Sequence, residues 1–324
     1  MDNLDFVKPI INDNINYREE QKDLISKAIE ISNNNKLIAL NYIVTSMNHE
    51  GHNVEFELVF TIPANNKVVI TLPIKECNPV DDLGYYVVWD NVLTHNTNFH
   101  TFEPNNITKD YRVKFFGLGI SKFGSEFDSE FSINDGYRKY LTKVISFGKL
   151  GHVFKSLNFA FYKCENNFTV PQILPSNITD TSEMFYWCDK FNQPLDMWNT
   201  YNISNMEGMF YFCTNFNQPL NTINVCNVRN MKYMFYKCNK FNQPLDRWDV
   251  YNVKNMNFMF CRCFVFNQPL SNWNTSSVIF MCGMFNSCYN FNQSLNNWNI
   301  HNVIDNDYMF TNCSILEKNK PRFK

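Results

Sequence analysis

The stretch that decides the fold is residues 241–265, FNQPLDRWDVYNVKNMNFMFCRCFV, because residue 266 begins the same pattern again. The motif FNQPL, or FNQSL in its last copy, starts at intervals of 25 residues: Phe191, Phe216, Phe241, Phe266 and Phe291. A register that runs over five units without an insertion predicts one supersecondary unit per repeat, each stacked on its neighbours. The second part of the chain is therefore expected to be a solenoid.

The same side chains recur at fixed places in every unit. A large apolar residue follows each Phe by seven positions: Trp198, Ile223, Trp248, Trp273 and Trp298. A Met-Phe pair recurs at Met184, Met209, Met234, Met259, Met284 and Met309. A cysteine stands three residues after the Phe of each pair: Cys188, Cys213, Cys238, Cys263, Cys288 and Cys313. We expect these residues, with the Phe and Leu of FNQPL, to form ladders inside the stack.

Each unit divides into two halves with different patterns. In the unit that begins at Phe241, Val253, Met256, Phe260 and Cys263 follow the spacing of one face of a short helix. Asparagines that precede the Ile or Val of this half are predicted helix N-caps: Asn202, Asn227, Asn252 and Asn302. FNQPL is too short for a helix and contains Pro, so we expect an extended segment with a very short strand beside it.

The cysteine column raises the question of a metal site or disulfides. A cysteine every 25 residues lacks the paired spacing of a zinc site, and no histidine accompanies it. We therefore predict thiols that pack as small apolar side chains. Cys261, two residues before Cys263, stands at a variable position and is expected to be exposed.

The first part of the chain has other periods. Residues 17–34 predict an amphipathic helix, and residues 36–46 are ambiguous between helix and strand. From residue 54 the apolar residues alternate, which predicts strands at residues 54–60 and 68–74 joined by a turn as a hairpin. Two more strands are predicted at residues 85–89 and 111–116, with a polar loop at 94–108 between them. These short strands favour a small antiparallel sandwich.

The predicted organisation therefore has five parts: a helical segment (1–50), a β-sandwich-like domain (51–135), transitional or capping coils (136–190), the repeat solenoid (191–315) and a charged tail (316–324). Open ends of a solenoid expose apolar side chains and strand edges. The β-domain, with residues 137–161 as a transitional coil, is expected to cover one end, and the charged tail to cover the other. The fold class that follows is α+β.

Composition restricts the kinds of partner. The chain has 324 residues, 29 basic and 31 acidic, and a net charge of −2. A thin row of basic residues between Lys232 and Arg262 is partly offset by Asp246 and Asp249, so no nucleic-acid partner is expected. No apolar run approaches the length of a membrane span, so no membrane insertion is expected. The N-terminus does not resemble a secretory signal, so secretion is not expected.

The repeats from about Phe161 to Cys313 resemble the BspA-like leucine-rich repeats, and more narrowly the 25-residue FNQPL variety of mycoplasma-type surface lipoproteins and giant DNA viruses. The resemblance implies a right-handed leucine-rich-repeat-like solenoid with a short strand and a short helix in each coil. Some bacterial relatives are surface proteins that bind host matrix or cells. No signal peptide or lipobox is recognisable, so the viral branch fits better. That branch implies the host cytoplasm or a virion over secretion, and it implies no assigned activity.

No constellation of residues in the sequence points to catalysis. The motifs of nucleotide-binding loops, zinc proteases and serine hydrolases are absent. The histidines that stand near each other, His49 with His52 and His95 with His100, lie in segments expected to be polar loops. The sequence therefore predicts no catalytic residue, no metal ligand and no cofactor.

A binding surface is the better hypothesis, because the positions that flank each Met-Phe pair vary between units. If these positions face outward, five aromatic residues form a possible interaction surface: Tyr211, Tyr233, Tyr236, Phe258 and Tyr308. The alternative is that they only pack against the next coil. We therefore expect a non-enzymatic scaffold for protein–protein interaction. Two alternatives stay open: a structural or virion component that binds host surface or glycan, and an enzyme whose site lies in residues 1–150.

Overall fold

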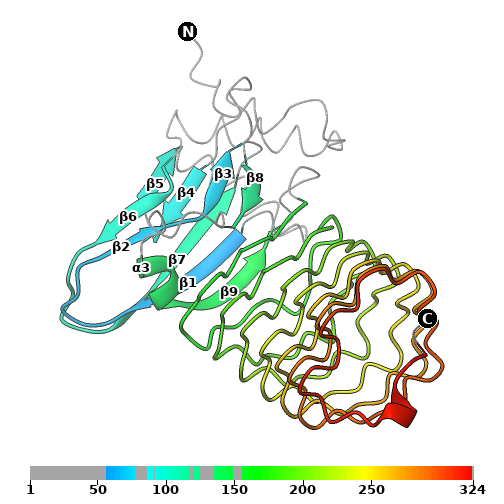
Figure 1. Cartoon of the computed structure of the whole chain (residues 1–324). Helices are drawn as coiled ribbons and strands as arrows, with labels where there is room; N and C mark the ends of the chain where they lie inside the picture. The colour runs from blue at the N-terminus through cyan, green and yellow to red at the C-terminus, as the bar shows by residue number, and fades with distance from the viewer. Residues whose placement is uncertain are drawn as a thin grey trace, which may run out of the picture.

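The computed structural model describes residues 56–76, 86–90, 92–95, 97–116, 120–124, 135–148 and 155–322. Its two parts are a group of small β-sheets and a stack of coils that begins near residue 155 (Figure 1). Apolar residues of both parts belong to one continuous core. The helical segment expected at residues 1–50 lies outside the described residues.

The largest sheet is antiparallel and has the strand order β5-β4-β7-β1-β9. Its strands are β1 (Phe56–Ile62), β4 (Tyr86–Trp89), β5 (Val92–His95), β7 (Lys109–Phe116) and β9 (Leu141–Phe147). The alternation of Phe56, Leu58 and Phe60 directs these side chains into the core, where all three are fully buried. Two smaller pairs accompany this sheet: β2 (Val68–Thr71) with β6 (Phe99–Phe102), and β3 (Ile74–Glu76) with β8 (Ile120–Phe123).

Two expectations for this part are wrong. β1 and β2 do not form a hairpin, because β1 pairs with β7 and β9 while β2 pairs with β6 in another sheet. The segment at 94–108 is not one polar loop, since it contains the end of β5 and all of β6. Alternation within a strand shows which side chains face inward, but it does not choose the partner strand.

The sheet joins the coil stack through β9. Val144 N–H donates to the carbonyl of Thr169 (2.7 Å), so the strand at the sheet edge is also a neighbour of the first turns of the stack. Helix α3 (Asp135–Tyr140) precedes β9, and the hydroxyl of its Tyr137 donates to the Ala160 carbonyl (2.9 Å). The β-sheet part therefore covers the first end of the stack, as expected from the need for a cap.

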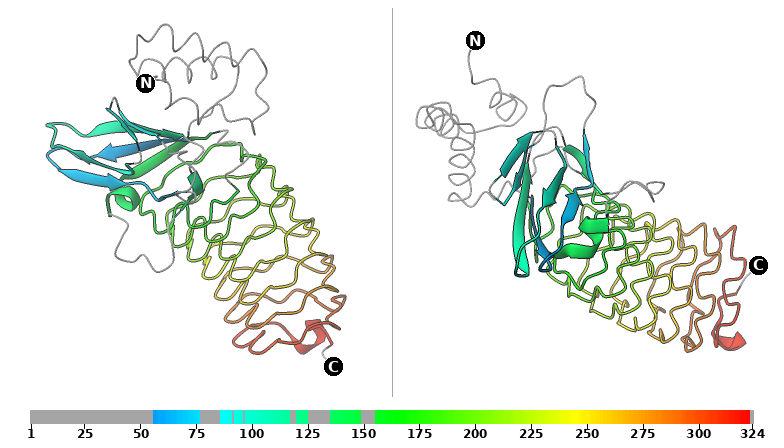
Figure 2. Two further views of the ribbon diagram at one scale, coloured as in Figure 1. Left: turned by 90° about the horizontal axis from the view of Figure 1, so that it is seen from above. Right: turned by 90° about the vertical axis from the view of Figure 1, so that its left-hand side faces the viewer.

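The stack consists of coils that repeat every 24 or 25 residues and lie side by side along one axis (Figure 2). Isolated parallel bridges connect one residue of each coil to its equivalent in the next: Ser156, Asp180, Asn205, Asn230, Asn255, Phe280 and Asp305. These bridges lie just before the first Met of the unit, not beside the Pro of FNQPL, so the expected strand position is wrong.

The expected α+β solenoid, with a helix and a strand in each leucine-rich-repeat-like coil, is also wrong. Within the described residues the one α-helix is α3, which lies outside the coils, and the part of each coil predicted to be helical is a series of turns. The cause is a pair of residues with positive φ in every coil, four positions apart. Tyr233 (φ 57°) and Lys237 (φ 59°) are one such pair, and a right-handed helix does not tolerate this conformation.

Backbone hydrogen bonds alternate along these turns. Met231 and Tyr233 donate their N–H groups to carbonyls of the following coil, those of Asn255 and Asn257 (both 2.9 Å). The amides between and after them close turns within the coil, as Met234 N–H does with the Met231 carbonyl (3.1 Å). In the turns closed by Met234 and Cys238, the third residue, Tyr233 or Lys237, has the positive φ that type II turns require. Every second amide therefore joins two coils, where a helix would satisfy it internally.

The interior contains the expected ladders. The rings of Phe216 and Phe241 stack with centroids 6.0 Å apart, and those of Trp248 and Trp273 with centroids 6.3 Å apart. These four side chains are at most 3% exposed, which confirms the inward direction of Phe and Trp. Each interior Trp has a polar partner, as when Trp248 Nε1 donates to the Leu220 carbonyl (2.8 Å).

The cysteine column lies in the same interior. Cys238 Sγ contacts the carbonyl of Phe210, in the preceding coil, at 3.0 Å. Four other thiols make the equivalent contact with a Phe carbonyl of the coil before their own. The cysteines of the described residues are free thiols, and those residues contain no group of His, Cys, Asp and Glu that could hold a metal ion. Cys261 is 4% exposed, so the expectation that it is exposed is wrong.

Asparagine side chains join the coils at the surface. The amide of Asn252 donates to the carbonyl of Cys226 in the preceding coil (2.7 Å), and Asn202, Asn227 and Asn302 make equivalent bonds. The sequence predicted that these asparagines are helix N-caps. That prediction is wrong, because no helix follows them. The Asn of FNQPL forms a second ladder, in which Asn217 Oδ1 accepts from the Asn242 backbone (3.0 Å).

The last coil is partly covered by the segment that follows it. Ile315 and Pro321 are buried, and η2 (Glu317–Asn319) contacts the last FNQSL segment through the Asn319 carbonyl, which accepts from Leu295 N–H (2.8 Å). Among the described residues, no helix has the length and apolar character needed to span a bilayer.

Candidate functional site

Three columns of residues lie next to each other on one side of the stack, and each column takes one residue from each of at least five successive coils. The first column, directly before Met-Phe, contains Glu183, Gly208, Tyr233, Phe258, Gly283 and Tyr308. The second, directly after it, contains Tyr186, Tyr211, Tyr236, Cys261 and Asn286. The third contains Trp187, Phe212, Lys237, Arg262 and Ser287. We call this side of the stack the aromatic face.

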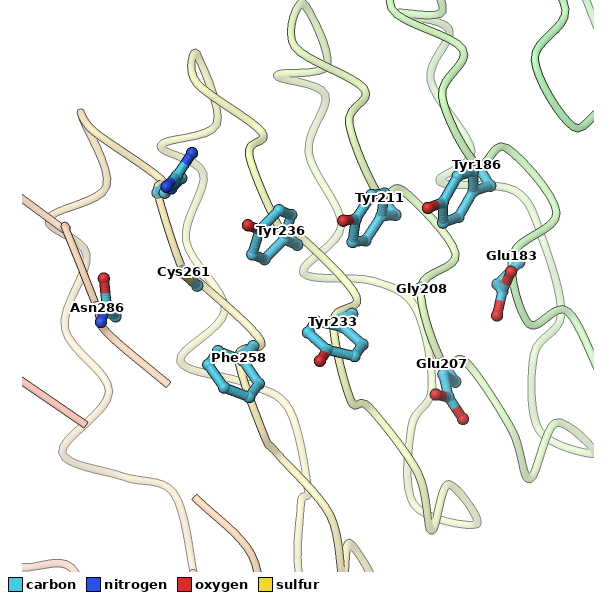
Figure 3. A pocket seen from close by; sticks show the side chains of 11 residues that line it. Glu183, Tyr186, Glu207, Gly208, Tyr211, Tyr233, Tyr236, Phe258, Cys261 and Asn286 are labelled. Atoms are coloured by element: carbon cyan, nitrogen blue, oxygen red, sulfur yellow. The ribbon is translucent and has the colours of Figure 1, made fainter. Parts of the chain in front are cut away.

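A groove of about 540 Å³ crosses this face over five coils (Figure 3). Its lining comes mainly from the first and second columns, from Glu183 and Tyr186 at one end to Arg262 and Asn286 at the other. The turns position these side chains, because residues of the first and third columns have positive φ and those of the second column lie between them.

The second column forms a ladder of tyrosine rings. Tyr186 and Tyr211 stack with centroids 4.3 Å apart and an angle of 2°, and Tyr211 and Tyr236 stack at 4.6 Å and 7°. Burial raises the pKa of all three phenols, and each also has a neighbouring tyrosine that raises it further. The phenols are therefore protonated at neutral pH and can donate hydrogen bonds to a ligand.

Tyr233 and Phe258 form a second aromatic element, perpendicular to the ladder. Their rings lie nearly parallel, with centroids 5.2 Å apart and an angle of 14°. The Tyr233 ring meets Tyr211 and Tyr236 at 82° and 86°. The groove thus offers two differently oriented aromatic walls, and both are only partly buried.

Two glycines in the first column give room to the side chain of the preceding coil. A Cβ on Gly283 would lie 2.2 Å from Cε1 of Phe258, so that ring rests directly on the glycine backbone. A Cβ on Gly208 would lie 3.0 Å from Cγ of Glu183, so the Glu183 side chain extends over Gly208. Gly208 leaves a hollow surrounded by Glu183, Glu207, Tyr211 and Tyr233 (Figure 3).

Charges lie at the two ends of the groove. Glu207 Oε1 is 3.5 Å from Nζ of Lys232, and the same ammonium lies 5.0 Å from the centroid of the Tyr233 ring. Arg262, at the opposite end, is exposed. The groove is therefore acidic at the Glu183 end and basic at the Arg262 end.

A second, smaller hollow of about 480 Å³ adjoins the groove and is lined by residues that include Trp187, Phe212 and Lys163. The rings of Trp187 and Phe212 stack at 4.4 Å and 17°. A lysine ammonium lies near each ring, that of Lys163 at 5.4 Å from Trp187 and that of Lys237 at 3.9 Å from Phe212. The aromatic face therefore extends beyond the groove and carries charges of both signs.

Four of the five residues proposed from sequence lie together in the groove: Tyr211, Tyr233, Tyr236 and Phe258. Tyr308 is 69% exposed but does not line the groove, which ends near Asn286. These residues stack on the next coil, as one interpretation predicted, and they also line the groove. Three further residues that line the groove were not predicted from the sequence: Tyr186, Glu183 and Glu207. The Met-Phe-x-x-Cys motif at Met184 contained the signal for Tyr186, since it extends the second column by one coil.

The histidines proposed as remote catalytic candidates do not gather into a site in the described residues. His95 lies in β5 and His100 in β6, which belong to different sheets. The His100 ring stacks on Trp89 with centroids 5.5 Å apart, and burial lowers its pKa. His49 and His52 lie outside the described residues.

The coils match one family model, described as mycoplasma protein of unknown function, DUF285, over residues 155–264 and 244–324. Together these matches cover more than half of the chain. The chain belongs to the DUF285 family. The match agrees with the mycoplasma-type resemblance of the repeats, while the leucine-rich-repeat architecture is not what the coils have. No curated protein matches this DUF285 chain, and no solved structure matches it either.

Proposed function

We propose that this DUF285 protein is a non-enzymatic scaffold that binds a protein partner through the groove of the aromatic face. One observation carries the proposal: side chains from five consecutive coils converge on one groove at positions that the interior does not need. Tyrosine is a preferred residue of protein interfaces because it buries a large ring at little conformational cost and keeps a hydroxyl for hydrogen bonding.

The electrostatics of the groove suit the binding of a protein. Burial raises the pKa of the Tyr186, Tyr211 and Tyr236 phenols further above their ordinary value, so all three stay protonated and can donate hydrogen bonds to a partner. Acidic and basic side chains are both present, which suits a mixed-charge protein surface better than the uniform charge of a nucleic acid.

Affinity capture with matched variants tests the proposal. The groove variant carries Tyr233→Ala and Phe258→Ala, and the control variant carries Tyr201→Ala and Tyr251→Ala, which replace tyrosines that are 54% and 51% exposed outside the groove. We expect proteins from the native source to be retained by the wild type and the control variant and lost from the groove variant. Identical capture by all three proteins, or turnover of a substrate by the purified chain, would contradict the proposal.

A further inference from the structure

The hollow over Gly208 differs from the rest of the groove in its chemistry. It lies where the aromatic run of the first column ends, and it is bordered by two carboxylate side chains and two tyrosine rings (Figure 3): Glu183, Glu207, Tyr211 and Tyr233. The carboxyl carbon of Glu183 lies 3.8 Å from the place of a Gly208 Cβ, which positions this carboxylate over the glycine. Carboxylates and aromatic faces both attract cations.

A cation of the chain already lies beside two of these groups. The Lys232 ammonium lies 3.5 Å from Glu207 Oε1 and 5.0 Å from the centroid of the Tyr233 ring. Both side chains of this ion pair are about one-third exposed, at 34% and 28%. A pair this long and this exposed contributes little to stability, so a ligand cation can replace it.

Arginine suits the hollow better than lysine does. Its guanidinium is planar, stacks on an aromatic ring and presents several N–H donors to carboxylates at once. It is also among the residues that contribute most to protein interfaces. The exposed Arg262 at the opposite end of the groove gives the complementary preference for an acidic group there.

We propose that Glu183, Glu207, Gly208, Tyr211 and Tyr233 form a subsite for an arginine side chain of the partner. This inference rests on the proposed function, because it specifies which protein segment the groove accepts. The segment lies along the tyrosine ladder, with its arginine over Gly208 and its acidic or polar end toward Arg262. Lys232 competes for the same carboxylate.

A displayed library of random peptides, selected on the full chain, tests the subsite. We expect the enriched peptides to contain arginine and to bind the Glu183→Gln/Glu207→Gln variant about tenfold more weakly, a change of about 1.4 kcal/mol. Replacing that arginine by glutamine in the peptide should have the same effect on the wild type and little further effect on the variant. The Lys232→Ala variant should bind the arginine peptide more tightly, because the internal competitor is gone.

Asp196→Asn, which replaces an exposed carboxylate outside both hollows, is the control and should leave affinity unchanged. Thermal unfolding of each variant shows whether the glutamine substitutions preserve the fold. Enriched peptides that lack arginine but still need Tyr233 and Phe258 would overturn the arginine subsite and leave the proposed function intact. Peptides that do not need these two rings, or the absence of any enriched peptide, would contradict both.

Discussion

The ring of Phe258 rests on the backbone of Gly283, in the space that a side chain at position 283 would occupy. A Cβ there would be 2.2 Å from Cε1 of the ring, and Gly283 also has a positive φ of 58°. The two residues are 25 positions apart, so the groove wall depends on the identity of the residue in the following coil. The aromatic face is therefore a property of neighbouring coils and not of single repeats.

Gly283→Ala should destabilise the protein by about 1–3 kcal/mol, because the new methyl group must displace an aromatic ring and adopt a strained backbone. Gly208→Ala is the matched control: its φ of 56° is equivalent, but its Cβ would meet the flexible side chain of Glu183 at 3.0 Å. Urea unfolding should show a smaller loss for the control. In a Phe258→Ala background the two glycine substitutions should become similar, and a difference that persisted would contradict the ring contact.

Phe241→Ala should cost about 3–5 kcal/mol, since its ring is fully buried between Phe216 and Phe266. Tyr233→Ala should cost much less, because Tyr233 is only partly buried and lines the groove. Urea unfolding of the two variants compares these losses directly. Equal losses would show that the assignment of inward and outward positions is wrong.

At an exposed position with positive φ, a glycine variant should be more stable than an alanine variant, which reverses the usual order. Tyr308 has φ 57° and is 69% exposed, so Tyr308→Gly should be more stable than Tyr308→Ala by about 1 kcal/mol. Tyr251, which is 51% exposed and lacks a positive φ, should show the usual order with Ala above Gly. The midpoints of thermal unfolding measure both pairs. The same order at both positions would contradict the turn structure of the coils.

Alkaline pH should destabilise the stack through its buried thiols. Burial raises the pKa of the interior cysteines well above the usual range: Cys164, Cys188, Cys213, Cys238, Cys263 and Cys288. The unfolded chain loses these protons above pH ~8.5 while the folded chain keeps them, so stability is full below that pH and falls above it. The expected slope is about 1.4 kcal/mol per pH unit for each thiol.

Urea unfolding at a series of pH values between about 7 and 10 checks this dependence. Each interior Cys→Ala substitution should reduce the slope of the unfolding free energy against pH by the contribution of one thiol. Cys282, which is only partly buried and whose pKa burial raises less than that of Cys238, gives the control: Cys282→Ala should reduce the slope by less than Cys238→Ala does. A free energy of unfolding that did not change with pH in this range would contradict the burial of the thiols.

The interior could be predicted from sequence because a 25-residue period brings identical side chains onto one another whatever the local backbone is. Phe216 and Phe241 stack as that period requires. The local backbone could not be predicted in the same way, because apolar residues at i, i+3, i+7 and i+10 suit a helix and also a series of turns. The residues with positive φ distinguish the turns from a helix. In most coils these are residues such as Tyr233 and Lys237, whose type does not indicate a positive φ.

Part of the candidate site could be predicted from the sequence for the same reason. Variable positions next to Met-Phe identify an outward surface, which is why Tyr211 and Tyr236 were found. The limits of the groove depend on three-dimensional details that the period does not contain. Gly283 and Cys261 end the aromatic runs of the first and second columns before Tyr308, and Glu207, which belongs to neither column, also lines the groove.

Residues 25 positions apart lie side by side and jointly form the groove, as the 4.6 Å separation of the Tyr211 and Tyr236 ring centroids indicates. A disulfide cross-link between neighbouring coils tests this arrangement most directly. A variant with Tyr211→Cys and Tyr236→Cys, oxidised mildly and mapped by mass spectrometry, should yield the linked peptide pair, since adjacent coils bring Cα atoms within disulfide range. A variant with Tyr211→Cys and Tyr251→Cys should not. Linkage in the second variant, or none in the first, would contradict the stack from which the groove is built.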